Sequence, residues 1–353
     1  TPSRVDAGMV YDLGPRRKDR PSDPWRCPAA TKTNQTFTSG LDMRKRSRYV
    51  EGMNKLSRTV RTQVLRCLVD GSSVRATSRI TGVSIPTVLK LLVDAGRVAA
   101  DFQDGVIKDV KAERIQCDEI WSFVGAKQKN VDRGAHGHGD VWTWTAMDSD
   151  SKLVLSYLVG NRDGDTAKTF MKDVADRLAS RVQITTDGHQ PYVAAIEGAF
   201  GADIDYAMLI KEYKNDSNPS DPARRYSPGH CTGTHTEVMQ GAPDEAHIST
   251  SHVERQNLTM RTHMRRFTRL TIAFSKKIEN HIASISLHFF VYNFCRVHKT
   301  LRVTPAMAAG IVAEVMDVDD LVRMIEADED TAQDIAARRK DRKPAQDAPT
   351  DQS

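Results

Sequence analysis

The stretch that decides the fold spans residues 114–124 and reads Arg-Ile-Gln-Cys-Asp-Glu-Ile-Trp-Ser-Phe-Val. Its apolar run predicts a buried β-strand. Asp118 lies in the middle of this run, where an uncompensated carboxylate would cost several kcal/mol of desolvation free energy. We therefore expect Asp118 to be either well paired or functional.

Two further acids occupy comparable places in the chain. Residues 182–188 read Val-Gln-Ile-Thr-Thr-Asp-Gly and predict a strand that ends at Asp187. Glu254 stands at the head of a long helical pattern that begins at Val253. Three carboxylates on separate elements can bind hard divalent cations and leave coordination positions for phosphate oxygens. The sequence thus predicts a metal site for phosphodiester chemistry, formed by Asp118, Asp187 and Glu254.

Other residues compete for places in this site. Glu119 points to the opposite face of a regular strand, so we rank it below Asp118. Glu237 and Glu245 are the alternatives if the helical pattern around Glu254 is misread. His189, two residues after Asp187, is a candidate for positioning water or phosphate.

Composition limits the class of protein. The 353 residues allow two or more domains, and 39% hydrophobic with 27% charged residues is typical of a globular protein. The chain lacks an apolar run of about 18 residues and an N-terminal signal-peptide pattern, so we expect a cytoplasmic protein, nucleoid-associated if it binds DNA. Five widely spaced cysteines without a CxxC motif favour neither disulfides nor a zinc ribbon. The net charge of +5 is compatible with a polyanionic partner.

The region before the predicted strands has a helical pattern. Apolar residues recur at helical spacing from Leu56, and a turn at 81–84 (Thr-Gly-Val-Ser) precedes a second helix with Pro86 in its first turn. Helix, glycine-containing turn and helix is typical of a helix-turn-helix, whose second helix enters a major groove; a generic three-helix bundle is the alternative. We expect DNA contacts from Arg58, Arg61, Ser84, Thr87 and Lys90.

The helix that begins near Val253 carries more polar residues on one stripe. Glu254, Asn257, Arg261 and Arg265 are separated by three, four and four residues, which places them on one helical face. We expect Asn257, Arg261 and Arg265 to contact DNA near the acids.

The whole pattern predicts an α/β fold: a ribonuclease H-like mixed sheet flanked by helices, preceded by an all-α helix-turn-helix domain. The expected divisions are a disordered basic segment (1–52), the helix-turn-helix domain (53–98), a helical linker (99–112), the catalytic domain (113–310) with an insertion at 214–250, and a C-terminal helix with a disordered tail (311–353). Charged, Ala-rich sequence places the start of that tail near residue 326.

At this point the chain resembles the DDE transposases of bacterial insertion sequences, most closely the insertion-sequence-one type. The segments 117–121 (Cys-Asp-Glu-Ile-Trp) and 252–257 (His-Val-Glu-Arg-Gln-Asn) carry the resemblance, with a closing segment at 292–306. Two features depart from the family pattern. The interval from Asp187 to Glu254 is longer than in many DDE families, and only Cys27 is present where an N-terminal zinc motif is often found.

The resemblance implies a two-metal site with Mg²⁺ or Mn²⁺, the ions lying about 3.5 to 4 Å apart and held by Asp118, Asp187 and Glu254. The implied reaction is cleavage of double-stranded DNA at the element's terminal repeats, followed by transfer of the new 3′-hydroxyls to target DNA. Two ends must be brought together, which implies a homo-oligomer. Two alternatives stay open: a catalytically inactive helix-turn-helix regulator, and a nuclease with the same metal site and no strand transfer.

Overall fold

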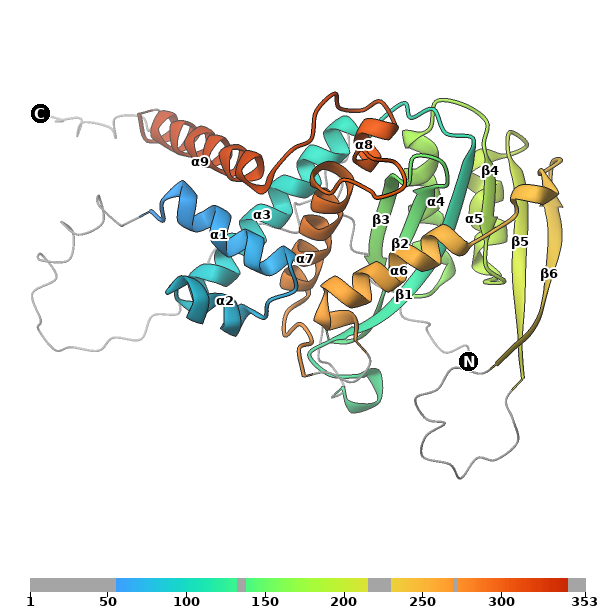
Figure 1. Ribbon diagram of the computed structural model, residues 1–353, viewed down its shortest axis with the longest axis horizontal. Coiled ribbons are helices and arrows are strands. Elements are labelled where there is room, and N and C mark those ends of the chain that lie inside the picture. Colours follow the sequence, from blue (N-terminus) through green and yellow to red (C-terminus); the bar gives the residue numbers. More distant parts are fainter. Residues whose placement is uncertain (1–54, 132–137, 215–229, 269–271, 342–353) are drawn as a thin grey trace, which may run out of the picture.

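A six-stranded mixed sheet forms one half of the molecule, and a bundle of helices forms the other (Figure 1). The computed structural model describes residues 55–131, 138–214, 230–268 and 272–341. The segment 1–52, predicted to be disordered, lies outside these ranges. Among the described residues, we find no helix with the length and apolar character needed to cross a bilayer.

The strand order in the sheet is β3-β2-β1-β4-β5-β6. The strands are β1 (Arg114–Val124), β2 (Gly139–Asp148), β3 (Val154–Gly160), β4 (Gln183–Thr186), β5 (Asp205–Lys214) and β6 (His230–Gln240). β1, β4 and β5 run parallel, whereas β2 and β6 are antiparallel to their neighbours. β1 and β4 match the strands predicted at 114–124 and before Asp187, and β6 occupies part of the predicted 214–250 insertion. A mixed sheet flanked by helices is therefore confirmed.

Two hydrophobic cores flank the sheet. One contains Cys117 and Trp144 on the face covered by α4 (Gly164–Arg177) and α5 (Pro191–Phe200). The other contains Ile120 on the opposite face, beneath α6 (Ser251–His263) and α7 (Ile278–Phe290), and Figure 1 shows α6 crossing this face. Because successive residues of β1 point to alternate faces, Asp118 and Glu119 leave the strand on opposite sides.

The helical half contains α1 (Arg58–Val69), α2 (Val74–Thr81) and α3 (Ile85–Val106). Ser84 caps α3 by accepting a hydrogen bond from the Thr87 amide, and Gly82 ends α2 with a φ of 72°. α3 is one continuous helix, so the predicted second helix and most of the predicted linker are a single element. The helix continues because no proline interrupts it after its first turn.

α3 packs closely on α7. A Cβ atom added at Gly96 would lie 2.4 Å from the Cα of Ala283, so only glycine permits this approach of the two helices. The helical half is thereby fixed against the sheet.

The closing part of the chain contains η6 (Val291–Cys295), α8 (Pro305–Ala308) and α9 (Val318–Asp341). α7 is followed directly by a π-helical turn, η6. α9 packs its apolar residues Leu321, Val322 and Ile325 against the helical half. The prediction that disorder begins near 326 is wrong, because α9 is a helix to Asp341; residues 342–353 lie outside the described ranges. Three short 3₁₀ turns complete the described structure: η2 (Gln128–Asn130), η4 (Glu245–His247) and η5 (Arg265–Phe267).

Candidate metal centre

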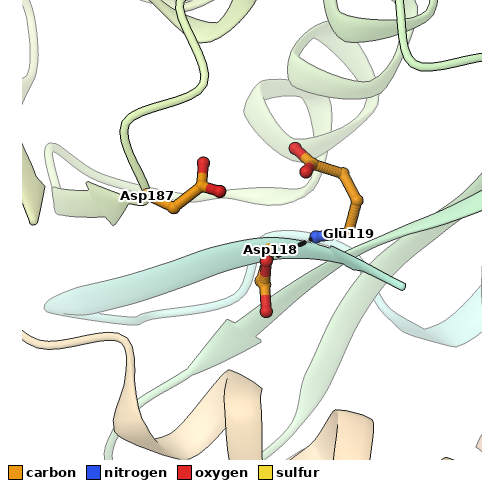
Figure 2. A group of neighbouring side chains, drawn as sticks. All are labelled: Asp118, Glu119 and Asp187. Carbon is orange, nitrogen blue, oxygen red and sulfur yellow. Dashed lines mark hydrogen bonds between the residues drawn. The ribbon is translucent and has the colours of Figure 1, made fainter. Parts of the chain in front are cut away.

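Three carboxylates meet where β1 and β4 run side by side. The parallel register aligns Gln116 with Thr185, so Asp118 on β1 comes next to Asp187, which directly follows β4. Asp118, Glu119 and Asp187 each offer an oxygen atom, and these oxygens lie within 4.8 Å of one another (Figure 2). The two aspartates come together as predicted, and Glu119 joins them.

Asp118 is the most constrained of the three. Its Oδ1 accepts a hydrogen bond from the Glu119 amide at 2.8 Å, and its Oδ2 accepts one from Nδ2 of Asn257 at 2.7 Å. Burial raises the pKa of Asp118 to about 7, and the negative charges of Asp187 and Glu254 act in the same direction. A carboxylate whose pKa is raised by neighbouring acids has a local excess of negative charge.

Glu119 is the more deeply buried acid, with a side chain that is 1% exposed. Figure 2 shows its carboxylate on the side of β1 opposite that of Asp118, facing Asp187. Arg162 donates to its Oε2 from Nε at 3.2 Å, and the buried Tyr192 hydroxyl interacts with the same carboxylate as a hydrogen-bond donor. Burial raises the pKa of Glu119 to about 8, and Asp187 and Asp118 add to the rise, while Tyr192 and Arg162 oppose it. A buried carboxylate is costly unless donors or a cation compensate its charge.

Arg162 links two of the acids. Its Nη2 lies 3.2 Å from Oε2 of Glu119 and 3.5 Å from Oδ2 of Asp187. The other oxygen of Asp187, Oδ1, accepts a hydrogen bond from the His189 amide at 3.0 Å. Arg162 therefore supplies the positive charge that two neighbouring carboxylates need in a metal-free site.

Glu254 lies near this group but outside it. Gln116 positions the start of α6, because its Oε1 accepts hydrogen bonds from the His252 and Val253 amides at 2.8 and 3.2 Å. The Glu254 carboxylate contacts Lys211 on β5 and the Thr250 hydroxyl. Burial lowers the pKa of Lys211, but Glu254 and the nearby Asp118 outweigh this effect and raise it. An ammonium group thus stands beside both Glu254 and Asp118.

The predicted stripe on α6 is interrupted. Asn257 is buried against Asp118 and is not exposed for DNA. α6 ends at His263, where the backbone of Met264 becomes extended so that Met264 and Phe267 can enter the core. The exposed Arg265 consequently belongs to η5. Arg261 is exposed on the last turn of α6.

His189 is half-buried, and its role in positioning water or phosphate stays a prediction. Its ring packs on Trp144 and Tyr192, with centroids 5.7 and 6.0 Å apart, and its Nε2 is buried without a hydrogen-bond partner among the described residues. Burial, together with the charge of Arg162, lowers its pKa.

The cationic residues predicted on α1 are engaged by α9. Arg58 binds Glu326 at 2.6 Å, and Arg61, whose side chain is 7% exposed, binds Glu329 at 3.2 Å. Buried and ion-paired, Arg61 has no face left for DNA.

The residues predicted at the start of α3 remain accessible. The hydroxyls of Ser84 and Thr87 share a hydrogen bond of 2.8 Å, and Lys90, 74% exposed, pairs with Asp94 one turn later.

The donor set fits a divalent cation. Carboxylate oxygens are the preferred ligands of Mg²⁺ and Mn²⁺. Three carboxylates lie within 4.8 Å of one another, and Arg162 is the cation that contacts two of them, so the group has room for further positive charge.

Two residues of the centre, Arg162 and Lys211, were missed by the sequence analysis. Arg162 follows a strand whose carboxyl end shares the sheet edge with β1 and β4, and Lys211 follows the apolar part of β5, so both depend on the sheet order and had no local signal.

Two sequence comparisons relate this chain to insertion sequences of the IS1 type. The family model described as IS1 transposase matches residues 235–294, which include Glu254, Asn257 and all of α6. The chain is 27% identical over 166 residues to "Insertion element iso-IS1n protein InsB" of Shigella dysenteriae, covering 47% of this chain and 86% of that protein. The resemblance to transposases of the insertion-sequence-one type is thereby confirmed.

Among solved structures, the chain is similar to the piggyBac transposase in a synaptic complex with hairpin DNA. The TM-score is 0.37 at 9% identity, and the match covers 76% of this chain and 69% of that one.

Proposed function

We propose that this chain is a transposase that cleaves DNA and joins the new 3′-hydroxyl to a second DNA site, using divalent cations held by Asp118 and Asp187. The observation that carries the proposal is the convergence of these two carboxylates from parallel strands, with α6 bonded to Asp118 through Asn257. The similarity to an insertion-element protein supports the same reaction class. The strand order, with acids on β1, after β4 and on α6, supports a ribonuclease H-like catalytic domain.

Asp118, Asp187 and Glu254 would hold the ions. Bound Mg²⁺ or Mn²⁺ polarises the phosphate and activates the attacking water or 3′-hydroxyl. The protein's own contribution is to fix the ligands: Asn257 orients Asp118, the His189 amide orients Asp187, and Lys211 with Thr250 holds Glu254 beside Asp118. Glu119 is the alternative third ligand, since it lies within the group of three while Glu254 does not.

DNA recognition forms the second part of the proposal. Gly82, the cap at Ser84 and the exposed Lys90 support a helix-turn-helix made by α2 and α3, with Ser84, Thr87 and Lys90 facing DNA. Arg261 and Arg265, both exposed, would contact backbone phosphates, which add affinity without reading sequence. Arg58 and Arg61 are left out because α9 pairs them. A transposase must hold two DNA ends, so we propose a homo-oligomer that acts on DNA in the bacterial cytoplasm.

The experiment uses a donor plasmid carrying the chain's gene with its flanking DNA, a target plasmid and Mg²⁺. Wild-type protein should yield cut ends and joined products, and Asp187→Asn should abolish both while the protein still folds and binds DNA. Asp165→Asn, which changes an exposed acid in the first turn of α4, is the matched control and should retain activity. Cut ends without joined products would identify a nuclease. DNA binding without cleavage by the wild type would identify the inactive regulator.

A further inference from the structure

Four aromatic side chains continue from the acids along the carboxyl end of the sheet. Trp121 and Phe123 share the face of β1 that carries Glu119, and Trp142 on β2 is the cross-strand partner of Trp121. The ring centroid of Phe123 lies 5.7 Å from that of Trp121 and 4.8 Å from that of Phe274, which precedes α7. We call Trp121, Phe123, Trp142 and Phe274 the aromatic strip.

Most of the aromatic strip lies outside the two hydrophobic cores. Trp121, Phe123 and Phe274 belong to neither hydrophobic core, and only Trp142 packs against one of them. Trp121, Trp142 and Phe274 are partly exposed, whereas Phe123 is buried and anchors the row. Large aromatic side chains kept outside the cores contribute less to folding than buried ones, which suggests that a ligand uses their exposed faces.

A cation lies over each ring of the strip. Arg162 lies 4.8 Å from the Trp142 centroid, Lys127 lies 5.8 Å from both Trp121 and Phe123, and Lys276 lies 3.9 Å from Phe274. Of the acids on these strands, Glu119 pairs with Arg162, and Asp140, opposite Phe123, accepts a hydrogen bond from the Gln128 amide at 3.0 Å. Rings alternating with positive charge are suited to a ligand that alternates flat bases with phosphates.

Arg162 joins this strip to the candidate metal centre. The same guanidinium that lies over Trp142 contacts Glu119 and Asp187. A strand whose phosphate is at the acids therefore has the aromatic strip as its continuation along β1.

We propose that the aromatic strip binds unpaired nucleotides of the DNA strand that enters the metal centre. Bases stack on Trp121, Trp142 and Phe274, and their phosphates pair with Lys127, Lys276 and Arg162. Bases inside a duplex are already stacked on their neighbours and cannot offer their faces to these rings, so the ligand is single-stranded. Stacking accepts any base, so the strip adds affinity without sequence choice. The inference rests on the proposed function, because that function supplies the DNA.

The test measures binding of fluorescein-labelled dT12 and of a 12-base-pair duplex by anisotropy, with EDTA present so that no cleavage occurs. Trp121→Leu should weaken dT12 binding about tenfold, as expected for the loss of one stacked base, and leave duplex binding within about twofold. Tyr213→Leu, which removes an aromatic ring 57% exposed on β5, is the matched control and should change neither. Unchanged dT12 binding, or an equal loss for the duplex, would overturn the proposal.

A second variant changes an exposed side chain and should not affect folding. Lys276 is exposed, so Lys276→Gln should leave the melting temperature unchanged while reducing the dependence of dT12 binding on salt. An unchanged salt dependence would overturn the proposal even if Trp121→Leu misfolds. The proposed chemistry is tested separately, with the wild type and Mg²⁺. A wild type that binds dT12 as predicted but never cleaves DNA would refute the transposase and leave the strip standing.

Discussion

Nδ2 of Asn257 donates a hydrogen bond to Oδ2 of Asp118 at 2.7 Å, which joins α6 to the central strand of the sheet. Both residues lie at positions that the sequence alone marked as functional, but the contact gives Asn257 a role inside the site in place of one on DNA. The bond fixes one carboxylate oxygen of Asp118, and the neighbouring Glu119 and Asp187 can then adjust to a bound cation.

Removing this bond should weaken the centre. Asn257→Ala leaves Asp118 buried with one fewer donor, so we expect a loss of about 1 to 2 kcal/mol in the free energy of unfolding. Mn²⁺ affinity should fall about tenfold, because the ligand is less well oriented. Urea unfolding and calorimetric Mn²⁺ titration measure the two effects. Thr262→Ala, an exposed change on the same helix, is the control, and equal Mn²⁺ affinities for both variants would count against the assigned role.

Arg162 should substitute for the missing cation in the metal-free protein. Arg162→Gln removes the cation that contacts the buried Glu119 and should cost about 1 to 3 kcal/mol of stability in EDTA. Saturating Mn²⁺ should recover most of this loss, since the metal then compensates the acids. Melting temperatures with and without Mn²⁺ test the idea, with Lys168→Gln as the exposed control. A loss that Mn²⁺ does not reduce would show that Arg162 acts only in packing.

Stability of the metal-free protein should fall as pH rises from 6.5 to 8. Asp118 and Glu119 have folded pKa values of about 7 and about 8, above their ordinary values, so the folded state binds more protons than the unfolded state in this interval. The buried His281 and His288, whose pKa values are lowered to about 3, affect stability only below about pH 6.5, where they cause a loss on acidification.

The variant Glu119→Gln isolates this effect. It should remove a decline of roughly 1 to 2 kcal/mol between pH 6.5 and 8. Chemical unfolding at several pH values in EDTA provides the measurement, and Glu279→Gln, an exposed acid in α7, provides the control. Parallel pH profiles for wild type and Glu119→Gln would contradict the raised pKa.

Two glycines of α3 offer a matched test of how the helical half is fixed to the sheet. Gly96→Ala places a methyl group against the backbone of Ala283 and should destabilise the protein by about 2 kcal/mol or more. Gly105→Ala meets no atom within 4 Å and should be neutral or stabilise by about 0.5 to 1 kcal/mol. Thermal unfolding distinguishes them. Similar melting temperatures for the two variants would mean that α3 and α7 separate readily.

Much of the fold is predictable from local patterns. The strand at 114–124 and the strand that ends at Asp187 follow from apolar runs, and the start of α3 follows from Ser84 and Pro86. β6 was not predicted, because its residues, His-Cys-Thr-Gly-Thr-His-Thr-Glu-Val-Met-Gln, are polar and lie on an edge strand with little burial to impose a pattern. The helix beyond 326 was missed because its acids pair with residues of α1. A local sequence pattern cannot reveal a contact between segments so far apart in the chain.

The candidate metal centre was only partly predictable from the sequence. Asp118 and Asp187 were found because carboxylates at strand positions are unusual. The sequence analysis ranked Glu119 too low. Alternation along β1 places its side chain on the face opposite that of Asp118. Asp187 lies beyond the end of β4, so this alternation does not keep Glu119 away from it. Arg162 and Lys211 required the sheet order, which no single segment encodes.

The most direct measurement is a calorimetric titration of Mn²⁺ into the wild type, Asp118→Asn, Asp187→Asn and the control Asp165→Asn. The account predicts saturable binding by the wild type and the control, and loss of that binding in both aspartate variants. Equal binding by all four proteins would contradict the claim that Asp118 and Asp187 form a metal centre.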